Sequence, residues 1–300
     1  MLPRQLPMPT EPLPLTTNYR SRGFSRRSIT VPEGSPEGLT YSIMQELLNI
    51  AIRASLAAGR DILSIYNDPA ADFGIERKAD NSPLTRADKA AHQRIMTFLE
   101  PTGIPVLSEE GSHLPYEERC HWSRLWIVDP LDGTKEFIKR NGEFTVNIAL
   151  VENGTPVLGV IYVPVTGTIY YGQTGEGAWK KALSSDSEAL PLTGERGEGL
   201  PFTVVASRSH LSPETEAFIN DLRREHPNLE LISSGSSLKI CLVAEGKADI
   251  YPRHAPTMEW DTAAGHAIVL AAGHEMVDAT TGKPLNYNKP DLHNPWFIVR

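Results

Sequence analysis

The stretch WIVDPLDGTKEF, residues 126–137, joins an apolar run to an acidic turn. The run ends at Asp129, Pro130 follows, and Asp132-Gly133 is a common turn pair. Proline donates no backbone hydrogen bond and glycine accepts a positive φ, so the chain can turn sharply after a buried strand here. Solvated turn chemistry is the simplest interpretation of the two aspartates. The alternative is that their carboxylates face one another and hold a cation.

Composition and charge narrow the class of protein. A chain of 300 residues with 40% hydrophobic and 22% charged residues is typical of a soluble globular protein of one large or two ordinary domains. It has no apolar run of the roughly 18 residues that a membrane span needs. The net charge of -8 argues against a nucleic-acid polymer as partner, since binding one depends on a broad basic surface. A small anionic ligand stays compatible, because bound metal ions can reverse the local sign.

Residues 1–40 differ from the rest of the chain. They contain seven prolines, five arginines and no lysine, with no periodic apolar pattern. We interpret them as a disordered leader. Their Arg and Ser content weakly resembles an organelle transit peptide, although the prolines oppose an amphipathic helix. A start codon nearer Met44 is a third interpretation.

Two helices and two short strands are predicted next. An amphipathic pattern predicts a helix from Tyr41 to Tyr66. A second helix follows, with Thr85 as its N-cap and Asp88 at its third position. The runs 105–111 and 124–130 are short apolar strands that end in acids.

The remaining elements suggest an antiparallel sheet and then a second α/β unit. Residues 144–180 read as a meander with a turn at Asn153-Gly154. The polar, Gly-rich stretch 181–200 reads as a domain junction, so we predict an α+β domain over 41–195 and a smaller α/β domain over 196–300. The second domain has predicted strands at 202–209, 230–237, 248–253 and 294–300 and helices at 213–225, 236–246 and 261–273.

Both short strands end in carboxylates. The first carries Glu109 and Glu110, and the second carries Asp129 and Asp132. If the two strands are parallel neighbours, these acids meet at one edge of the sheet. The turn also leaves the Leu131 carbonyl free to point at a cation. Ligands that are all oxygen favour a hard divalent cation, Mg²⁺ before Zn²⁺.

Each acid alone has an ordinary structural explanation. Asp261 reads as a helix N-cap, and Asp88 as a residue that favours the helix dipole. Thr134 opens a predicted helix whose N–H groups would face an anion. Because all the acids stand at element ends and the whole DPLDGT hexapeptide is present, a site is the better interpretation.

The motifs SEE, WIVDPLDGT and WDTAAG, in this order and spacing, resemble the magnesium-dependent, lithium-sensitive inositol monophosphatase superfamily. The resemblance runs from about residue 42 to 300 and implies a layered αβαβα sandwich, an α+β or α/β fold, with a metal site between two lobes. DNSPLTRADKAAH, DGTKEF, NGEFTVNIAL and SSLKICLVAEGKADIYPR are most similar to the 3′(2′),5′-bisphosphate nucleotidases of CysQ type. Those enzymes hydrolyse adenosine 3′,5′-bisphosphate to AMP and phosphate, in sulfur assimilation and nucleotide recycling.

The resemblance also implies site residues. It implies that two or three Mg²⁺ ions are bound by Glu109, Asp129, the Leu131 carbonyl, Asp132 and Asp261. It implies that the catalytic residues are Asp88 and Thr134, which hold and activate the attacking water, together with Glu109. It implies that substrate is bound by Leu131, Asp132, Gly133, Thr134, Asp261, Ser236, Lys239 and Arg253, of which the last three contact the nucleotide.

Such a site fits the chemistry of phosphate monoesters, which hydrolyse extremely slowly unaided. Two metal ions about 3.5–4 Å apart can lower the pKa of the nucleophilic water and stabilise the leaving oxygen. Several carboxylates packed together repel one another without cations, so metal binding should also stabilise the fold.

Other functions fit the sequence less well. Haloacid dehalogenase phosphatases share a DGT turn, but their two aspartates stand two apart, whereas Asp129 and Asp132 are three apart, so we reject that class. A serine or cysteine hydrolase is excluded, since there is no GxSxG and neither cysteine stands at a turn. An inositol or other sugar-phosphate phosphatase is the alternative enzyme. A metal or nucleotide sensor is the non-enzyme alternative, which the presence of both Asp88 and Thr134 disfavours.

We prefer a nucleotide bisphosphate as substrate because Lys135 and the pair Lys239 and Arg253 add positive charge for a second phosphate. We expect no nucleic-acid polymer as partner, no transmembrane segment, and a monomer or homodimer. Cys120 and Cys241 lack CxxC spacing, so a disulfide framework is not expected. We therefore expect a cytoplasmic protein, with peripheral association at the cytoplasmic face of a membrane as the alternative.

Overall fold

The computed structural model describes residues 36–70, 72–78, 82–112, 114–183, 189–197, 199–207 and 212–300, with only the backbone for 36–39. The greater part of the predicted leader, residues 1–35, lies outside these described residues. Its last five residues belong to the first helix, α1 (Pro36–Tyr66), which begins before the predicted start at Tyr41. No helix in the described residues is long and apolar enough to cross a membrane.

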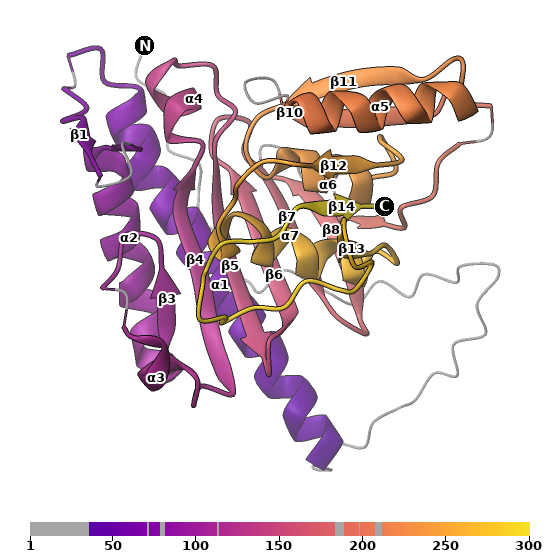
Figure 1. Ribbon diagram of the computed structural model, residues 1–300. Coiled ribbons are helices and arrows are strands. Elements are labelled where there is room, and N and C mark those ends of the chain that lie inside the picture. Colours follow the sequence, from indigo (N-terminus) through magenta and orange to yellow (C-terminus); the bar gives the residue numbers. More distant parts are fainter. Residues whose placement is uncertain are drawn as a thin grey trace.

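Two helices form the first layer (Figure 1). α1 and α2 (Arg86–Leu99) pack against each other and against one face of the large sheet through a shared apolar core. The predicted N-cap of α2 is confirmed, since the Thr85 side chain accepts from Asp88 N and the Asp88 carboxylate accepts from Thr85 N at 2.7 Å. This reciprocal capping satisfies the backbone groups that a helix start leaves free.

A seven-stranded sheet forms the second layer, in the order β3-β4-β5-β6-β7-β8-β9. Its strands are β3 (Val106–Ser108), β4 (Arg124–Asp132), β5 (Thr145–Glu152), β6 (Thr155–Val163), β7 (Thr168–Gln173), β8 (Gly177–Ala182) and β9 (Leu190–Leu192). β3 runs parallel to β4, and every later pair is antiparallel. The parallel pair and the meander that the sequence predicts are therefore both present.

Short elements connect these layers at their edges. They are β1 (Glu76–Arg77), β2 (Pro83–Leu84), the 3-10 helix η1 (Glu100–Thr102), α3 (Tyr116–Arg119) and α4 (Thr134–Ile138).

The third layer consists of α6 (Leu238–Ala244) and α7 (Glu259–Ala271), and α7 lies directly on the sheet (Figure 1). Gly159 on β6 makes this approach possible, because a Cβ there would lie 2.2 Å from the Ala264 carbonyl oxygen of α7. The start of α7 is thereby held close to the strands that carry the acidic motif. Each helix begins and ends two residues away from its predicted limits, which were 236–246 for α6 and 261–273 for α7.

Two small sheets and one helix complete the layers. The strands are β10 (Thr203–Ser207), β11 (Glu230–Ser234), β12 (Tyr251–Arg253), β13 (Met276–Asp278) and β14 (Phe297–Val299), and α5 (Pro213–Glu225) covers them, as predicted for 213–225. β10 and β11 are parallel, β14 pairs with β12 and β13, and a bridge from Val204 to Ile250 links the two sheets. Val204 packs with Ile219 of α5, whereas Val205 points into the core shared with α6 and α7. The predicted αβαβα order is confirmed.

The core under α7 draws on both predicted domains. Ile127 and Ala149 of the large sheet share one apolar cluster with Val205, Ile240 and Ala263. The division near residue 195 stays a prediction, and the two parts are packed against each other through this core.

Candidate active site

A β-bulge at the end of β4 brings Asp129 and Asp132 to the same side of the strand. Asp129 pairs with Asn147 of β5 and Asp132 pairs with Thr145, so β4 advances by three residues while β5 advances by two. In a regular strand, residues three apart point to opposite faces, and the extra residue of the bulge reverses this. The chain then turns at Gly133, which has a φ of 94°.

Asp261, at the start of α7, joins the two aspartates of β4. Carboxylate oxygens of Asp129, Asp132 and Asp261 all lie within 4.8 Å of one another. Met258, and not Asp261 as predicted, is the N-cap of α7, and Asp261 stands at the third helical position. Its Oδ2 accepts the Met258 backbone N–H at 2.8 Å. We call Asp129, Asp132 and Asp261 the acidic cluster.

Glu109 approaches the cluster from the neighbouring strand. Its backbone N–H donates to the Val128 carbonyl at 3.1 Å, which continues the parallel β3–β4 pairing, and its side chain lies close enough to Asp129 to raise the pKa of that residue. Lys78, which the sequence did not single out, places its ammonium 2.6 Å from Glu109 and 2.5 Å from Glu110. The strand ends thus meet at one edge, as the sequence predicts.

Burial and mutual repulsion raise the pKa of these acids. Burial, and then the charges of Glu109, Asp132 and Asp261, raise the pKa of Asp129 well above its usual value. Burial and the charge of Asp132 raise the pKa of Asp261 to about 8. Burial also raises the pKa of Glu109, although the Lys78 ammonium opposes this. The cluster therefore lacks a sufficient counter-charge among the described residues.

The donor set fits a hard divalent cation. Three carboxylates so close together are costly to ionise in a buried site unless a cation compensates them. Every donor is oxygen, which suits Mg²⁺ better than softer metals. The Leu131 carbonyl lies in the same turn, 3.3 Å from the Thr134 hydroxyl.

Asp88 and Thr134 form a second polar pair beside the cluster. Thr134 Oγ1 lies 3.0 Å from Asp88 Oδ1, while Asp88 Oδ2 accepts from the N–H and hydroxyl of Thr85. Asp88 is almost fully buried, and this burial raises its pKa despite the hydrogen bonds. One oxygen of Asp88 thus caps α2 and the other faces Thr134.

A pocket opens next to the acidic cluster, between the large sheet and the two small ones. Its lining residues are Asp132, Gly133, Glu136, Ser207, Gly235, Ser236, Ser237, Lys239, Ile240, Tyr251, Arg253, Thr257, Asp261, Thr262 and Phe297. Six of the eight residues expected at the substrate are among them, whereas Leu131 and Thr134 are not. The pocket therefore joins residues from both predicted domains.

Two cations face this pocket. Lys239 is 5% exposed, its Nζ donates to the Ser236 carbonyl at 2.5 Å, and burial lowers its pKa to about 8 although Asp132 opposes the shift. Arg253 donates one Nη2 bond to the Pro256 carbonyl at 3.3 Å, and its buried Nε has no hydrogen-bond partner among the described residues. Both positions suit an anionic ligand.

The comparisons with known proteins agree with this geometry. The model of the inositol monophosphatase family matches residues 43–296. The chain belongs to this family.

Within the family, the chain is similar to proteins of CysQ type. The 3′(2′),5′-bisphosphate nucleotidase CysQ of Escherichia coli O157:H7 is 49% identical over 81% of this chain and 94% of its own length. The Buchnera aphidicola protein of the same name is 40% identical over 82% of this chain and 89% of its own. The crystal structure of CysQ from Bacteroides thetaiotaomicron has a TM-score of 0.78 at 57% identity, and covers 85% of this chain and 97% of that one. The predicted resemblance is confirmed.

A more distant structure shares the fold. The IMPase of Thermotoga maritima has a TM-score of 0.65 at 24% identity, and covers 85% of this chain and 91% of that one. The layered architecture is thus common to inositol monophosphatase family members whose sequences differ widely.

Sequence reasoning missed the donors that orient Asp132. Ser236 and Ser237 donate to Asp132 Oδ2 at 2.8 and 2.7 Å, and the Asn147 amide lies 3.4 Å away. Ser236 has a φ of 50°, a left-handed conformation that is uncommon for a residue with a side chain. Ser236 also lines the pocket, so its contact with the nucleotide, which the resemblance implies, stays a prediction.

Lys135 does not have the position that the substrate preference assumed. It is exposed and lies outside the pocket lining, where its neighbour Glu136 stands instead. The α4 turn explains this, because consecutive residues of a helix point in different directions. Positive charge in the pocket comes from Lys239 and Arg253 alone among the three basic residues considered.

Proposed function

We propose that this chain is a 3′(2′),5′-bisphosphate nucleotidase, a phosphoric monoester hydrolase that removes the 3′-phosphate of adenosine 3′,5′-bisphosphate and gives AMP and phosphate. The observation that carries the proposal is the convergence of Asp129, Asp132 and Asp261 within 4.8 Å, beside a pocket lined by Lys239 and Arg253. The similarity to CysQ proteins supports the choice of substrate.

The proposed cofactor is Mg²⁺, as two or three ions. The residues that would hold it are Glu109, Asp129, Asp132, Asp261 and the Leu131 carbonyl. Bound Mg²⁺ neutralises phosphoryl charge and lowers the pKa of water at such a site. The oxygen-only donors and the raised pKa values of Asp129 and Asp261 support this assignment.

Asp88 and Thr134 are proposed to hold and activate the attacking water. The Thr134 hydroxyl donates to Asp88 at 3.0 Å, so its lone pairs stay available to a water molecule. Burial raises the pKa of Asp88, which makes its carboxylate a better proton acceptor. A proton leaving water can therefore pass through Thr134 to Asp88 without crossing bulk solvent.

The substrate is proposed to lie across the pocket. The backbone N–H groups of Gly133 and Thr134 would donate to the scissile phosphate, and Asp132 and Asp261 would hold the metal beside it. Lys239 and Arg253 would bind the second phosphate, since both are cations beside the cluster. An inositol monophosphate has no second phosphate for them to bind.

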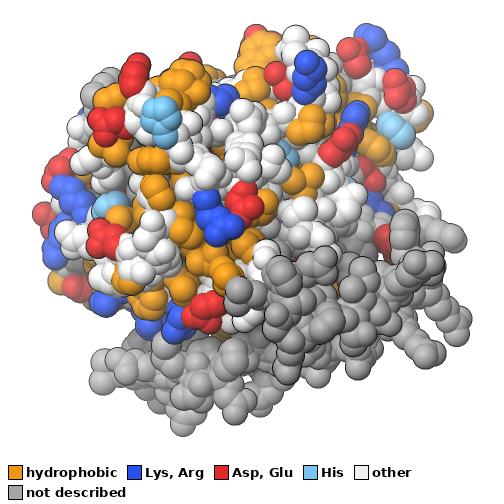
Figure 2. All heavy atoms as spheres, turned by 90° about the horizontal axis from the view of Figure 1, so that it is seen from below, with side chains coloured by type: hydrophobic (Ala, Val, Ile, Leu, Met, Phe, Trp, Pro, Cys, Tyr) orange, Lys and Arg blue, Asp and Glu red, His pale blue; other side chains and the backbone are white. Residues whose placement is uncertain are grey.

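The remaining assignments concern partners and place in the cell. On the face seen in Figure 2, acidic and basic side chains of the described residues are interspersed, which does not favour a nucleic-acid polymer there. Both cysteines are free, Cys120 exposed and Cys241 buried, as a reducing cytoplasm requires. We propose a cytoplasmic monomer or homodimer.

A side-by-side substrate test decides the proposal. Purified protein with Mg²⁺ should release phosphate from adenosine 3′,5′-bisphosphate far faster than from inositol 1-phosphate, and lithium should inhibit it. Equal rates, or the reverse order, would end the nucleotidase assignment. No phosphate release from any phosphate monoester would leave a metal or nucleotide sensor as the explanation.

A further inference from the structure

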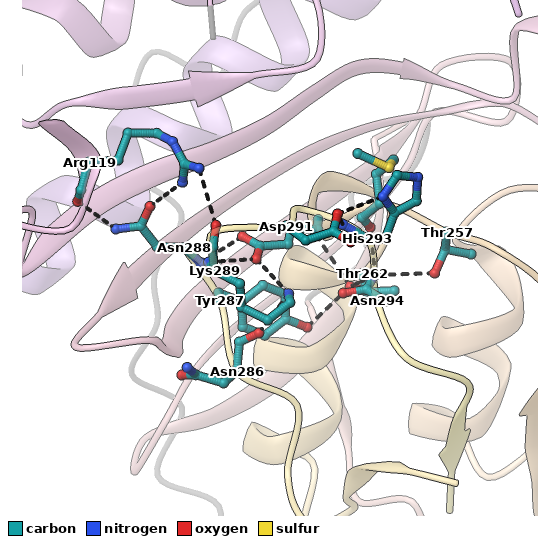
Figure 3. A network of polar contacts seen from close by, with 12 residues as sticks. Arg119, Thr257, Thr262, Asn286, Tyr287, Asn288, Lys289, Asp291, His293 and Asn294 are labelled. Atoms are coloured by element: carbon teal, nitrogen blue, oxygen red, sulfur yellow. Dashed lines mark hydrogen bonds and ion pairs between the residues drawn. The ribbon is translucent and has the colours of Figure 1, made fainter. Parts of the chain in front are cut away.

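The segment 286–294, between β13 and β14, crosses the N-terminal end of α7 (Figures 1 and 3). We call it the C-terminal strap. Its Asn294 amide donates to the Met258 carbonyl at 2.6 Å and to the Thr262 hydroxyl at 3.0 Å. Met258 and Thr262 stand on either side of Asp261 in the sequence. The strap therefore contacts the chain both before and after the one cluster carboxylate that comes from α7.

Glu259 is the main attachment of the strap to α7. Its side chain is fully buried, and it accepts the backbone N–H of Asn288 at 2.6 Å and that of Lys289 at 3.0 Å. The Lys289 ammonium adds an ion pair at 2.5 Å. A buried carboxylate is tolerated only when its charge is paired and hydrogen-bonded, and the strap supplies all three of these partners.

Arg119 of α3 holds the strap from its other side. Its guanidinium donates to the Asn288 side-chain oxygen at 2.6 Å and to the Lys289 carbonyl at 3.1 Å, and the Asn288 amide donates back to the Arg119 carbonyl at 2.8 Å (Figure 3). Arg119 is only 3% exposed. Asn288 is thus the middle link between α3 and Glu259.

The acidic cluster explains why such an attachment matters. Asp129 and Asp132 are held by the ladder of a sheet, whereas Asp261 depends on the position of the first turn of α7. Like charges repel the Asp261 carboxylate from the other two, so that turn needs support from outside the cluster. Glu259 stands two residues before Asp261 in the same turn. Its hydrogen bonds to the strap therefore hold this turn from outside the acidic cluster.

From these contacts we propose that Glu259, Asn288 and Arg119 are positioning residues that hold Asp261 at the distance a divalent cation requires. The inference rests on the proposed function, in which Asp261 binds the metal. None of the three lines the pocket. Because partners behind a ligand usually change metal affinity about 10–100-fold, their loss should weaken Mg²⁺ binding more than it weakens the chemical step.

Two variants and a control test this inference on the full chain. Asn288→Gly keeps the N–H that Glu259 accepts and tolerates the φ of 60°, but it removes both side-chain contacts with Arg119. Glu259→Gln keeps the shape and removes the charge. The control is Glu245→Gln, which breaks another buried ion pair, with Lys180 at 2.9 Å, at the far end of α6.

The measurement is the dissociation constant for Mg²⁺ alone, by calorimetry, beside the melting temperature. We expect Asn288→Gly and Glu259→Gln to raise that constant about tenfold or more, with kcat restored at saturating Mg²⁺. Glu245→Gln should lower the melting temperature and leave the constant unchanged. If all three variants only lower the melting temperature, the strap is merely structural. If Glu259→Gln does not fold, the Mg²⁺ dissociation constant of Asn288→Gly tests the inference by itself.

Repeating Asn288→Gly in an Asp261→Asn background separates this inference from the proposed function. If Asp261 is the route of the effect, the second change adds nothing to the loss that Asp261→Asn causes. Full additivity would overturn the positioning role. Unchanged Mg²⁺ affinity in Asp261→Asn alone would instead overturn the proposed metal site.

Discussion

Asp261 on α7 places a carboxylate oxygen within 4.8 Å of one from Asp129 on β4, although the two residues are 132 positions apart in the sequence. Neither position can be moved independently, since Asp129 lies in the β4–β5 ladder and Asp261 lies in the first turn of a helix packed on the sheet. Without a cation the two carboxylates repel each other, whereas together they can bind a divalent cation.

The first prediction concerns stability and pH without metal. Asp261 has a pKa of about 8 in the folded chain and an ordinary value of 3.8, so the folded state binds this proton more tightly. The stability that the Asp261 proton contributes is therefore full below pH 3.8 and is lost as pH rises through 8. Between pH 6.5 and 8 we expect a loss of up to about 2 kcal/mol in the free energy of unfolding.

Urea unfolding in a chelator at the two pH values checks this, and Mg²⁺ should remove the loss. The range lies above the titration of buried His266, whose pKa burial lowers from 6.5 to about 4 and which destabilises the fold only as pH falls below 6.5. A flat response in the chelator would contradict the prediction. Asp261→Asn is the control that should reduce the response, and Asp129, whose pKa is also raised, accounts for what is left.

The second prediction is that Asp129→Asn abolishes turnover and leaves a folded protein. The change removes a proposed metal ligand but also removes one like charge from the cluster, so the metal-free variant should be at least as stable as wild type. Phosphate release and the melting temperature in a chelator measure the two effects. Retained activity would rule out the ligand role.

The third prediction concerns Thr134. Thr134→Val keeps the shape and removes the hydroxyl that donates to Asp88, so kcat should fall about 10²-fold or more with little change in KM. Thr134→Ser keeps the hydroxyl and should retain most of the rate. An unchanged kcat in Thr134→Val would contradict the role of the hydroxyl.

The fourth prediction separates the pocket cations from exposed charge. Arg253→Met should raise KM for adenosine 3′,5′-bisphosphate about tenfold or more, since a charged hydrogen bond to phosphate is lost. Lys135→Met removes an exposed lysine outside the pocket and should leave KM unchanged. Steady-state kinetics at saturating Mg²⁺ compares them. A larger rise in KM for Lys135→Met than for Arg253→Met would instead indicate that Lys135 supplies the positive charge for the second phosphate.

The sequence by itself determined the features whose partners are close in the chain. Thr85 and Asp88 cap α2 within one turn, and the DPLDGT turn follows from Pro130 and Gly133. The sequence also identified β3 and β4 as short apolar runs that end in acids, whereas their parallel pairing was only a condition of the predicted site. Local hydrogen bonding and the period of apolar residues are enough for such features.

Only the tertiary structure decided which distant side chains meet. Lys78 against Glu109, Ser237 against Asp132, and Arg119 against Asn288 carry no signal in their own neighbourhoods. Lys135 shows the converse, a charged residue beside the motif that points away from the pocket. The physical reason is that such contacts depend on how distant elements pack, as α7 packs on Gly159 and the strap on Glu259, and packing depends on the whole core rather than on any one stretch of chain.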